Sequence, residues 1–291
     1  MTFDAAKTAF QRYGVEFSVE KYRALGITQN DVYTNLALLL SDQCHHTIKV
    51  AVFKDEFCTE FRDSKEFGGS VFKQLDDAIN YLALCNKTVS TIKGVVRTDK
   101  QDYPEEAIRE ALLNALVHRD YSFSGSTLVN IYDDRIEFIS LGGLVTGLKM
   151  ETIFIGVSQT RNPALAAVFY RLRLIESFGT GIEKIQQSYL DTAARPEFIA
   201  VYGGFKVVLP NINEVQAKEL GISETQECYG FADEKDKVMQ LAAMQGYVTR
   251  KQVEDALQVK TTKAYMLLQE LCDADRLAPI GVGRSRKYIS R

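Results

Sequence analysis

Apolar residues in the first hundred positions follow two different spacings. Ile48 to Phe53 alternates in the manner of a strand, and Tyr33 to Leu40 is apolar enough to begin a buried helix. From Ser70 to Leu84, apolar residues recur on one side of a helix. The pattern predicts a mixed α/β segment over residues 1–102.

The central part, residues 103–210, alternates between strand and helix patterns. Leu128 to Tyr132 and Ile136 to Ile139 predict the two strands of one hairpin, and Phe198 to Leu209 predicts a second hairpin. Between the hairpins, Asn162 and the proline after it open a helix. This combination favours an α+β fold class.

Before the first hairpin, the chain predicts a helix with one polar stripe. Pro104 fits the first turn of a helix, and the two glutamates after it favour the positive end. Glu110, Asn114 and His118 then recur every four residues, so they share one helix face. A carboxylate, a carboxamide and an imidazole along one stripe are unusual in a core helix. The stripe indicates a helix that offers polar side chains to a hydrated metal and a phosphate chain.

Two glycine-rich turns follow the stripe. Ser140 to Leu144 places two glycines after a predicted strand, where missing side chains let the backbone approach a ligand closely. Gly179-Thr180-Gly181 stands at a predicted helix start, where backbone N–H groups are free to bind phosphate. Each turn alone is weak evidence for a nucleotide site.

The C-terminal part has a different charge. Residues 211–233 are polar and acid-rich and predict a linker, and residues 234–291 predict three helices followed by two short strands. This order is that of a winged helix-turn-helix. Residues 234–291 hold eleven Lys or Arg against seven Asp or Glu, a net charge of +4, although the whole chain carries −3. A basic segment on an acidic body is typical of duplex DNA binding.

In a winged helix, the third helix enters the major groove and the wing lies beside phosphates. The expected groove residues are Lys260, Thr261, Thr262 and Lys263, and the expected wing residues are Arg284, Arg286 and Lys287. A protein-interaction module with a solvated basic face is the alternative.

Composition narrows the class of protein. Hydrophobic content of 46% with 25% charged residues is typical of a soluble globular protein. The sequence contains no apolar run of about 18 residues, so we expect no membrane span. The N-terminus has no signal-peptide pattern. The five cysteines form no CxxC pair, so we expect a reduced, cytoplasmic chain without structural zinc. Cys44-His45-His46 is poor metal geometry and favours a loop or strand start over a metal site.

In their order, the helix with asparagine, the strand with two glycines and the Gly-x-Gly helix start resemble the nucleotide-binding elements of the GHKL ATPase superfamily. More closely, the central part is similar to the C-terminal module of proteins named transcriptional regulators or RecG-like ATP-dependent DNA helicases. The matching stretches are Arg109 to Tyr121, Asp134 to Leu144 and Arg161 to Ile182. The resemblance implies a GHKL-like α/β sandwich over residues 103–210.

In that family a Schlafen-like AlbA domain usually precedes this module, and a winged helix often follows it. Residues 1–102 look like a connector and the end of an AlbA-like domain. A complete AlbA-like domain is not recognisable, which leaves open that the chain is part of a longer protein.

The resemblance also implies roles for residues at matching positions. Asn114 would hold the Mg²⁺ that bridges the phosphates of ATP, and Glu110 would activate water. The glycines that would flank adenine are Gly142 and Gly143, and the residues that would cover the phosphates are Gly179, Thr180 and Gly181. Ser140 stands where the superfamily usually has the aspartate that reads adenine, and serine is a less selective acceptor. A degenerate fold, in which Glu110 and Asn114 only brace a loop, is the alternative.

The sequence therefore favours a regulator of transcription that binds double-stranded DNA and whose GHKL-like module binds a nucleotide or forms a homodimer. The alternative is an ATP-hydrolysing, DNA-processing enzyme. A P-loop GxxxxGK[ST] is absent, so we expect no strand unwinding and leave weak ATPase activity open. His118-Arg119-Asp120 matches a kinase HRD loop, but no DFG follows. We expect His118 and Asp120 to cap the helix end and hold the next turn.

Overall fold

The computed structural model describes residues 1–53, 60–93, 95–176, 179–219, 238–239, 242, 247–257, 261–273, 276–281 and 286–290. The chain divides into two compact units, Met1–Ser223 and Glu224–Arg291. The polar stripe and both glycine-rich turns lie in the first unit, and the basic residues expected to meet DNA belong to the second.

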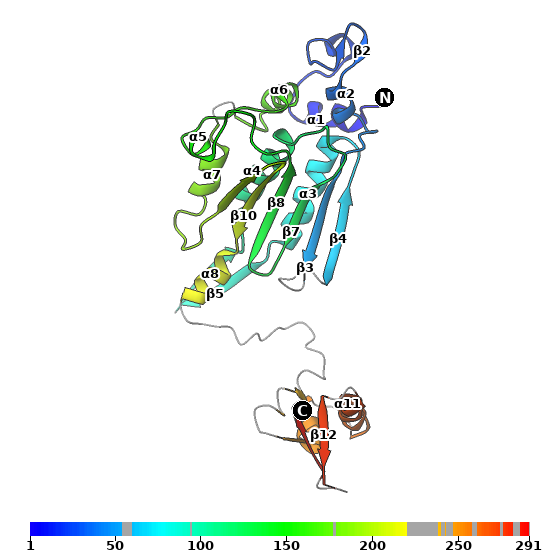
Figure 1. Cartoon of the computed structure of the whole chain (residues 1–291), viewed down its shortest axis with the longest axis vertical. Helices are drawn as coiled ribbons and strands as arrows, with labels where there is room; N and C mark the ends of the chain where they lie inside the picture. Colours follow the sequence, from blue (N-terminus) through cyan, green and yellow to red (C-terminus); the bar gives the residue numbers. More distant parts are fainter. Residues whose placement is uncertain are drawn as a thin grey trace. The chain divides into compact units, whose positions relative to one another are not determined.

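The first unit is built on a six-stranded mixed sheet (Figure 1). In spatial order its strands are β4 (Phe61–Phe67), β3 (Ile48–Phe53), β7 (Thr127–Ile131), β8 (Arg135–Leu141), β10 (Gly204–Pro210) and β9 (Glu197–Val201). β3 and β7 run parallel, and the other neighbouring pairs are antiparallel. Both predicted hairpins are confirmed, as β7–β8 and β9–β10. Because β3 and β4 come from the first hundred residues, that segment and the central part share one sheet.

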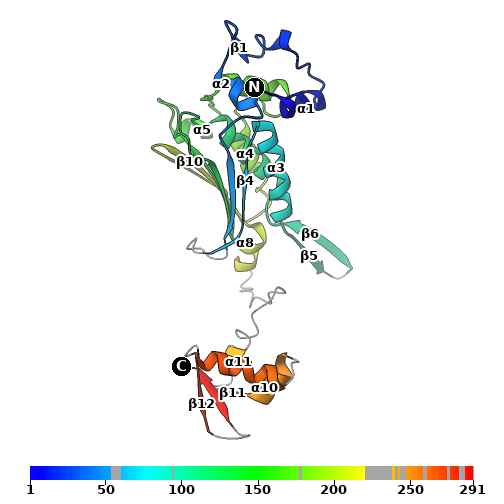
Figure 2. The same cartoon turned by 90° about the vertical axis from the view of Figure 1, so that its right-hand side faces the viewer.

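Two long helices, α3 (Val71–Cys85) and α4 (Glu105–Val117), pack on one face of this sheet (Figure 2). Both confirm helices predicted from apolar spacing. The remaining short elements of the unit are α1 (Asp4–Arg12), the 3₁₀ helix η1 (Val19–Lys21), β1 (Thr28–Gln29), β2 (Val32–Tyr33), α2 (Asn35–Leu40), α5 (Met150–Phe154), α6 (Pro163–Arg171) and α7 (Gly181–Gln187). One continuous hydrophobic core, from Phe3 to Ile212, joins helices and sheet.

Two features of the first unit, a hairpin and a helix, were not expected from the sequence. β5 (Thr88–Lys93) and β6 (Val96–Gln101) form an antiparallel hairpin that projects from the body (Figure 2). The expected linker over residues 211–233 begins with a helix, α8 (Ile212–Glu219), which contacts β6. The Ile212 N–H donates to the Asp102 carbonyl at 2.8 Å, and this bond ties the helix start to the body. Residues 220–233 lie outside the described residues.

The second unit combines helices with a small sheet. Its elements are β11 (Val248–Thr249), α10 (Arg250–Leu257), α11 (Thr261–Asp273), β12 (Leu277–Ile280) and β13 (Lys287–Ser290). The strand order is β11-β13-β12 with antiparallel pairs, and a separate apolar core includes Val253, Leu268 and Tyr288. α10 and α11 followed by β12 and β13 agree with the last two helices and the strand pair of the predicted order, whereas β11 was not predicted and most of the first predicted helix lies outside the described residues. The assignment as a winged helix stays a prediction.

The segment directly after α4 buries a charged side chain. Arg119 is 1% exposed, and no carboxylate of the described residues forms a salt bridge with it. Its guanidinium donates to the Thr127 hydroxyl at 3.0 Å and to the carbonyls of Phe123 and Gly125. Because the acceptors lie on the loop before β7 and on the strand itself, Arg119 fixes the end of α4 to the sheet.

Asn162 fixes the same helix end from another direction. Its carboxamide nitrogen donates to the Val117 carbonyl at 2.9 Å and to the Arg119 carbonyl at 2.6 Å. The last carbonyls of a helix lack intrahelical partners, so one side chain at the start of α6 satisfies the last carbonyl of α4 and one carbonyl of the segment after it. α4 and α6 are therefore joined by hydrogen bonds as well as by the shared core.

Replacing Asn162 by alanine should destabilise the end of α4. Asn162→Ala leaves two carbonyl groups without their donor, which costs about 1–3 kcal/mol. Hydrogen exchange of the α4 amides, followed in urea on the full chain, measures the loss. Asn80→Ala, the same change at an exposed position of α3, should stay within about 0.5 kcal/mol of the wild type. Equal effects of the two substitutions would contradict the bridging role.

Candidate functional site

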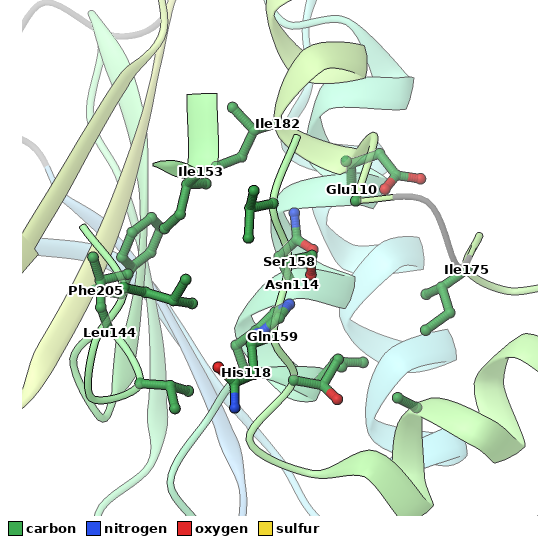
Figure 3. Close-up of a pocket in the computed structure, with 18 of the residues that line it drawn as sticks. Glu110, Asn114, His118, Leu144, Ile153, Ser158, Gln159, Ile175, Ile182 and Phe205 are labelled. Atoms are coloured by element: carbon green, nitrogen blue, oxygen red, sulfur yellow. The ribbon is translucent and has the colours of Figure 1, made fainter. Parts of the chain in front are cut away.

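A cavity of about 490 Å³ lies between α4, β8, β10 and the helices α5 to α7. Its polar lining includes Glu110, Asn114, His118, Ser140, Gln159 and Lys184, and its apolar lining includes Leu144, Ile153, Ile175, Ile182, Phe205 and Val207. Figure 3 shows Leu144, Ile153 and Phe205 gathered on the side opposite Glu110. The cavity therefore has an apolar side next to the sheet and a polar side next to α4.

The polar stripe predicted on one helix face lines this cavity. Glu110, Asn114 and His118 follow one another along α4, and all three side chains belong to the lining (Figure 3). A residue every four positions in a helix keeps to one face. α4 thus presents a carboxylate, a carboxamide and an imidazole to the same enclosed space.

Glu110 is a buried carboxylate with one close cation. The Arg109 guanidinium donates to its Oε1 at 2.6 Å, while the Glu110 side chain is only 8% exposed. Burial raises the pKa of Glu110, and the charges of Arg109 and Lys184 oppose that rise. A carboxylate with a raised pKa is suited to accept a proton near neutral pH.

Asn114 has the most open hydrogen-bonding capacity in the stripe. Its side-chain amide forms no hydrogen bond within the described part of the chain, and the residue is half-buried. A Cβ atom at Gly181 would lie 3.0 Å from Asn114 Nδ2 and 3.3 Å from Glu110 Oε2. The backbone at the start of α7 therefore lies directly against both side chains, and only glycine fits there without displacing them.

His118 closes the helix and also faces the cavity. It is the C-cap residue of α4, and its N–H donates to the Asn114 carbonyl. Burial lowers the pKa of His118, against the opposing effect of its bond to the backbone of Gln159, and so favours the neutral imidazole. Asp120 accepts from the Ser122 N–H at 3.0 Å and holds the next turn. The structural roles expected for His118 and Asp120 are confirmed.

Ser140 lies at the apolar side of the cavity. It is 3% exposed, stands on β8 opposite Phe205 of β10, and belongs to the lining. A hydroxyl both donates and accepts hydrogen bonds. The apolar side therefore offers a polar group that selects less strictly than a carboxylate would.

The glycines expected to approach a ligand have contacts within the protein instead. A Cβ atom at Gly142, which has φ +98°, would lie 2.8 Å from Asp120 Cβ, and one at Gly143 would lie 2.5 Å from the Val201 carbonyl oxygen. At Gly179, with φ +70°, the nearest atom would be the Gly156 carbonyl oxygen at 2.4 Å. All three line the cavity, but tight backbone packing already accounts for their lack of side chains.

Sequence reasoning did not identify Lys184, Arg161 or Phe205. Lys184 lines the cavity from α7, and Phe205 lines it from β10. Arg161 donates to the Gly143 carbonyl at 2.8 Å and pairs with Asp120 at 3.3 Å, so it supports the glycine loop from behind. Arg161 belongs to the motif Arg161-Asn162-Pro163, which is visible in the sequence, but only the folded chain shows what its side chain contacts.

The basic residues expected to bind DNA are only partly described. Lys260 and Arg284 lie outside the described residues, and of Thr261 and Thr262 only the place at the start of α11 is described. Lys263 is exposed on α11. Arg286 donates to the Gly281 carbonyl at 3.5 Å, and the Lys287 Nζ lies 3.7 Å from the centre of the Tyr247 ring.

A family model described as "Putative ATP-dependent DNA helicase recG C-terminal" matches residues 126–209. The chain therefore contains an ATPase-like domain of the RecG C-terminal type. The match covers β7 to β10 and the cavity walls between them, and it begins after α4. The likeness in sequence thus does not itself reach Glu110 and Asn114.

A solved structure with a similar fold is that of the DIP2311 protein from Corynebacterium diphtheriae. Its TM-score is 0.61 with 21% sequence identity, over 99% of this chain and 60% of the other. The chain thus spans about 60% of the length of that protein. A comparison with curated proteins gives no match.

None of the helices in the described ranges has the length and apolarity that a membrane crossing requires. The described side chains also include no group of three or more His, Cys, Asp and Glu placed to hold a metal ion.

The buried carboxylate should make stability depend on pH. Because burial raises the pKa of Glu110, the wild type loses stability relative to Glu110→Gln as the pH rises through that raised value. We expect the glutamine variant to be the more stable at pH 8, with the difference shrinking towards pH 4. Melting temperatures of both proteins across this range measure it. A wild type that instead gains stability relative to Glu110→Gln as the pH rises would show that the Arg109 ion pair outweighs burial.

Proposed function

We propose that the cavity binds ATP with Mg²⁺ and that the chain is a DNA-binding transcriptional regulator in which this nucleotide acts as a signal. The carrying observation is the Asn114 carboxamide, which has no partner in the described part of the chain and faces a cavity beside Glu110. In the sequence, Asn114 shortly precedes the ATPase-like domain that residues 126–209 match. Carboxamide and carboxylate oxygens, together with phosphate oxygens, are ligands that Mg²⁺ prefers.

The residues fit such a ligand in two respects. A purine is flat and apolar on its faces, and Phe205, Val207 and Leu144 give one side of the cavity that character. The volume of about 490 Å³ falls within the range of small-molecule sites. In the bound state, Asn114 would hold the metal, Ser140 would contact the base, and Gly181 would leave room at the phosphates.

Weak hydrolysis is the second candidate activity, and the position of Glu110 favours it. Mg-ATP would supply a phosphoanhydride bond and a metal that partly neutralises its charge. Glu110 has a raised pKa and lies one turn from Asn114, so it is suited to accept the proton of an attacking water. The Arg109 guanidinium would hold the carboxylate in place during that transfer.

DNA binding is proposed for the second unit. Within this unit, residues 234–291 carry a net charge of +4 in an otherwise acidic chain, which supports attraction to phosphates. Lys263 on α11, Arg286 before β13 and Lys287 on β13 are the basic residues of the expected set that the structure describes. In a winged helix, the start of the third helix contacts the major groove of DNA, and the strand pair contacts the DNA backbone.

Nucleotide binding should require both Asn114 and magnesium. We expect wild-type protein at 100 times Kd of Mg-ATP to gain about 2.7 kcal/mol of stability, and Asn114→Ala to lose this gain because the metal ligand is gone. Glu110→Gln should keep the gain and lose any phosphate release. Thermal unfolding with and without Mg-ATP, and a phosphate assay, measure the two effects. Asn80→Ala is the control. Equal melting temperatures of the wild type with and without Mg-ATP would overturn the proposal.

Duplex binding should fall steeply with salt and depend on the wing. Replacing Arg284 and Arg286 by alanine should weaken binding to all duplexes alike and lower the slope of log K against log salt by about 2. Replacing Thr261 or Thr262 should instead change sequence preference. Fluorescence anisotropy of the full chain with random and selected duplexes measures this, and Lys7→Ala in the first unit is the control. Absence of duplex binding at about 50 mM salt would favour an interaction module.

A further inference from the structure

One ion pair at the cavity rim has no part in the roles assigned so far. Lys184 of α7 is 27% exposed, lines the cavity and donates to Glu176 Oε1 at 2.7 Å. The Thr180 hydroxyl donates to Glu176 Oε2 at 3.1 Å. Glu176 is 55% exposed and also belongs to the lining. The pair therefore joins the residues before and after the second glycine-rich turn, directly at the cavity.

The charges of the cavity are unfavourable for a polyphosphate as they stand. Among the described residues of the lining, Lys184 is the one with a permanent positive charge, whereas Glu110 and Glu176 are both acidic. Arg109 lies nearby, but its guanidinium is occupied by Glu110 and by the Leu174 carbonyl. An anionic ligand gains a cation here only if Lys184 exchanges Glu176 for the ligand.

The position of Lys184 corresponds to the phosphate end of the proposed ligand. It follows Gly181 by three residues, so it lies about one turn further along α7 than the backbone that rests against Asn114 and Glu110. The charge of Lys184 also acts on the Glu110 carboxyl, whose pKa it lowers. Ser140 and Phe205, at the apolar side, belong to the other end of the cavity.

Both partners are charged at neutral pH. The hydrogen bond to Glu176 raises the pKa of Lys184, and the same bond lowers the pKa of Glu176. The lysine can therefore exchange one anion for another without gaining or losing a proton.

We propose that Lys184 binds the phosphates of the nucleotide and that Glu176 is a built-in competitor that holds this lysine when the cavity is empty. The inference rests on the proposed nucleotide site and adds the residue that binds its anionic part and the residue that limits its affinity. A phosphate group must displace Glu176 before it pairs with Lys184. Removing the Glu176 charge should therefore strengthen binding, although Glu176 itself lines the site.

The test is a double-mutant cycle on the full chain with Mg-ATP, measured as Kd by isothermal titration. Lys184→Met should weaken binding about tenfold or more, because a charge-assisted hydrogen bond is lost. Lys184→Arg should restore most of it. Glu176→Gln should tighten binding several-fold in the wild type and have no such effect when combined with Lys184→Met. Adenosine, which lacks phosphates, should bind all variants alike.

Glu183→Gln is the matched control. Glu183 is the residue before Lys184, is exposed, and bonds to Gln187 rather than to the lysine. Glu183→Gln also removes one negative charge, from the helix that carries Lys184, so its Kd should equal that of the wild type. If Glu183→Gln and Glu176→Gln tighten binding equally, the effect comes from the overall negative charge near the cavity and not from the bond between Glu176 and Lys184, and the inference is wrong.

The two proposals fail in distinguishable ways. No binding of Mg-ATP to the wild type would overturn the nucleotide site itself. Normal binding to the wild type with unchanged affinity in Lys184→Met would overturn only the role of Lys184. Additive effects of Glu176→Gln and Lys184→Met would overturn the competition between glutamate and ligand.

Discussion

The candidate site depends on how the C-terminal end of α4 is held. Asn162 donates to the carbonyls of Val117 and Arg119, and the buried Arg119 guanidinium donates to the Thr127 hydroxyl and two loop carbonyls. These bonds fix the rotation of α4 about its axis relative to the sheet and α6. A rotation of one residue, about 100°, would turn Asn114 away from the cavity. The polar stripe is a site because the helix end is fixed.

This arrangement gives two sequence motifs a structural role that differs from catalysis. In His118-Arg119-Asp120-Tyr121, the arginine anchors the helix, the aspartate holds the next turn, and the Tyr121 hydroxyl donates to the Leu116 carbonyl. In Arg161-Asn162-Pro163, the first residue supports the glycine loop and the second caps α4. The chemistry that we propose lies one and two turns earlier, at Asn114 and Glu110.

The sequence predicted the elements that local spacing controls. The stripe on α4, both hairpins of the central part and the starts of α3 and α6 follow from periodicity and helix-start residues. The packing of Gly143 against Val201 and of Gly179 against Gly156 joins segments far apart in the chain, so no local pattern reveals it. The pair Lys184–Glu176 spans the turn before α7, and the β5–β6 hairpin consists mostly of polar residues. Neither leaves an apolar periodicity to recognise.

We propose that α4, the glycine loop and the start of α7 enclose one ligand. Hydrogen exchange of the full chain with and without saturating Mg-ATP tests this most directly, because amides closed by a ligand exchange more slowly. Exchange should slow in residues 110–118, 140–145 and 179–184 and stay unchanged in β4 at the far edge of the sheet. Unchanged exchange in all three segments, or protection confined to other parts of the chain, would contradict it.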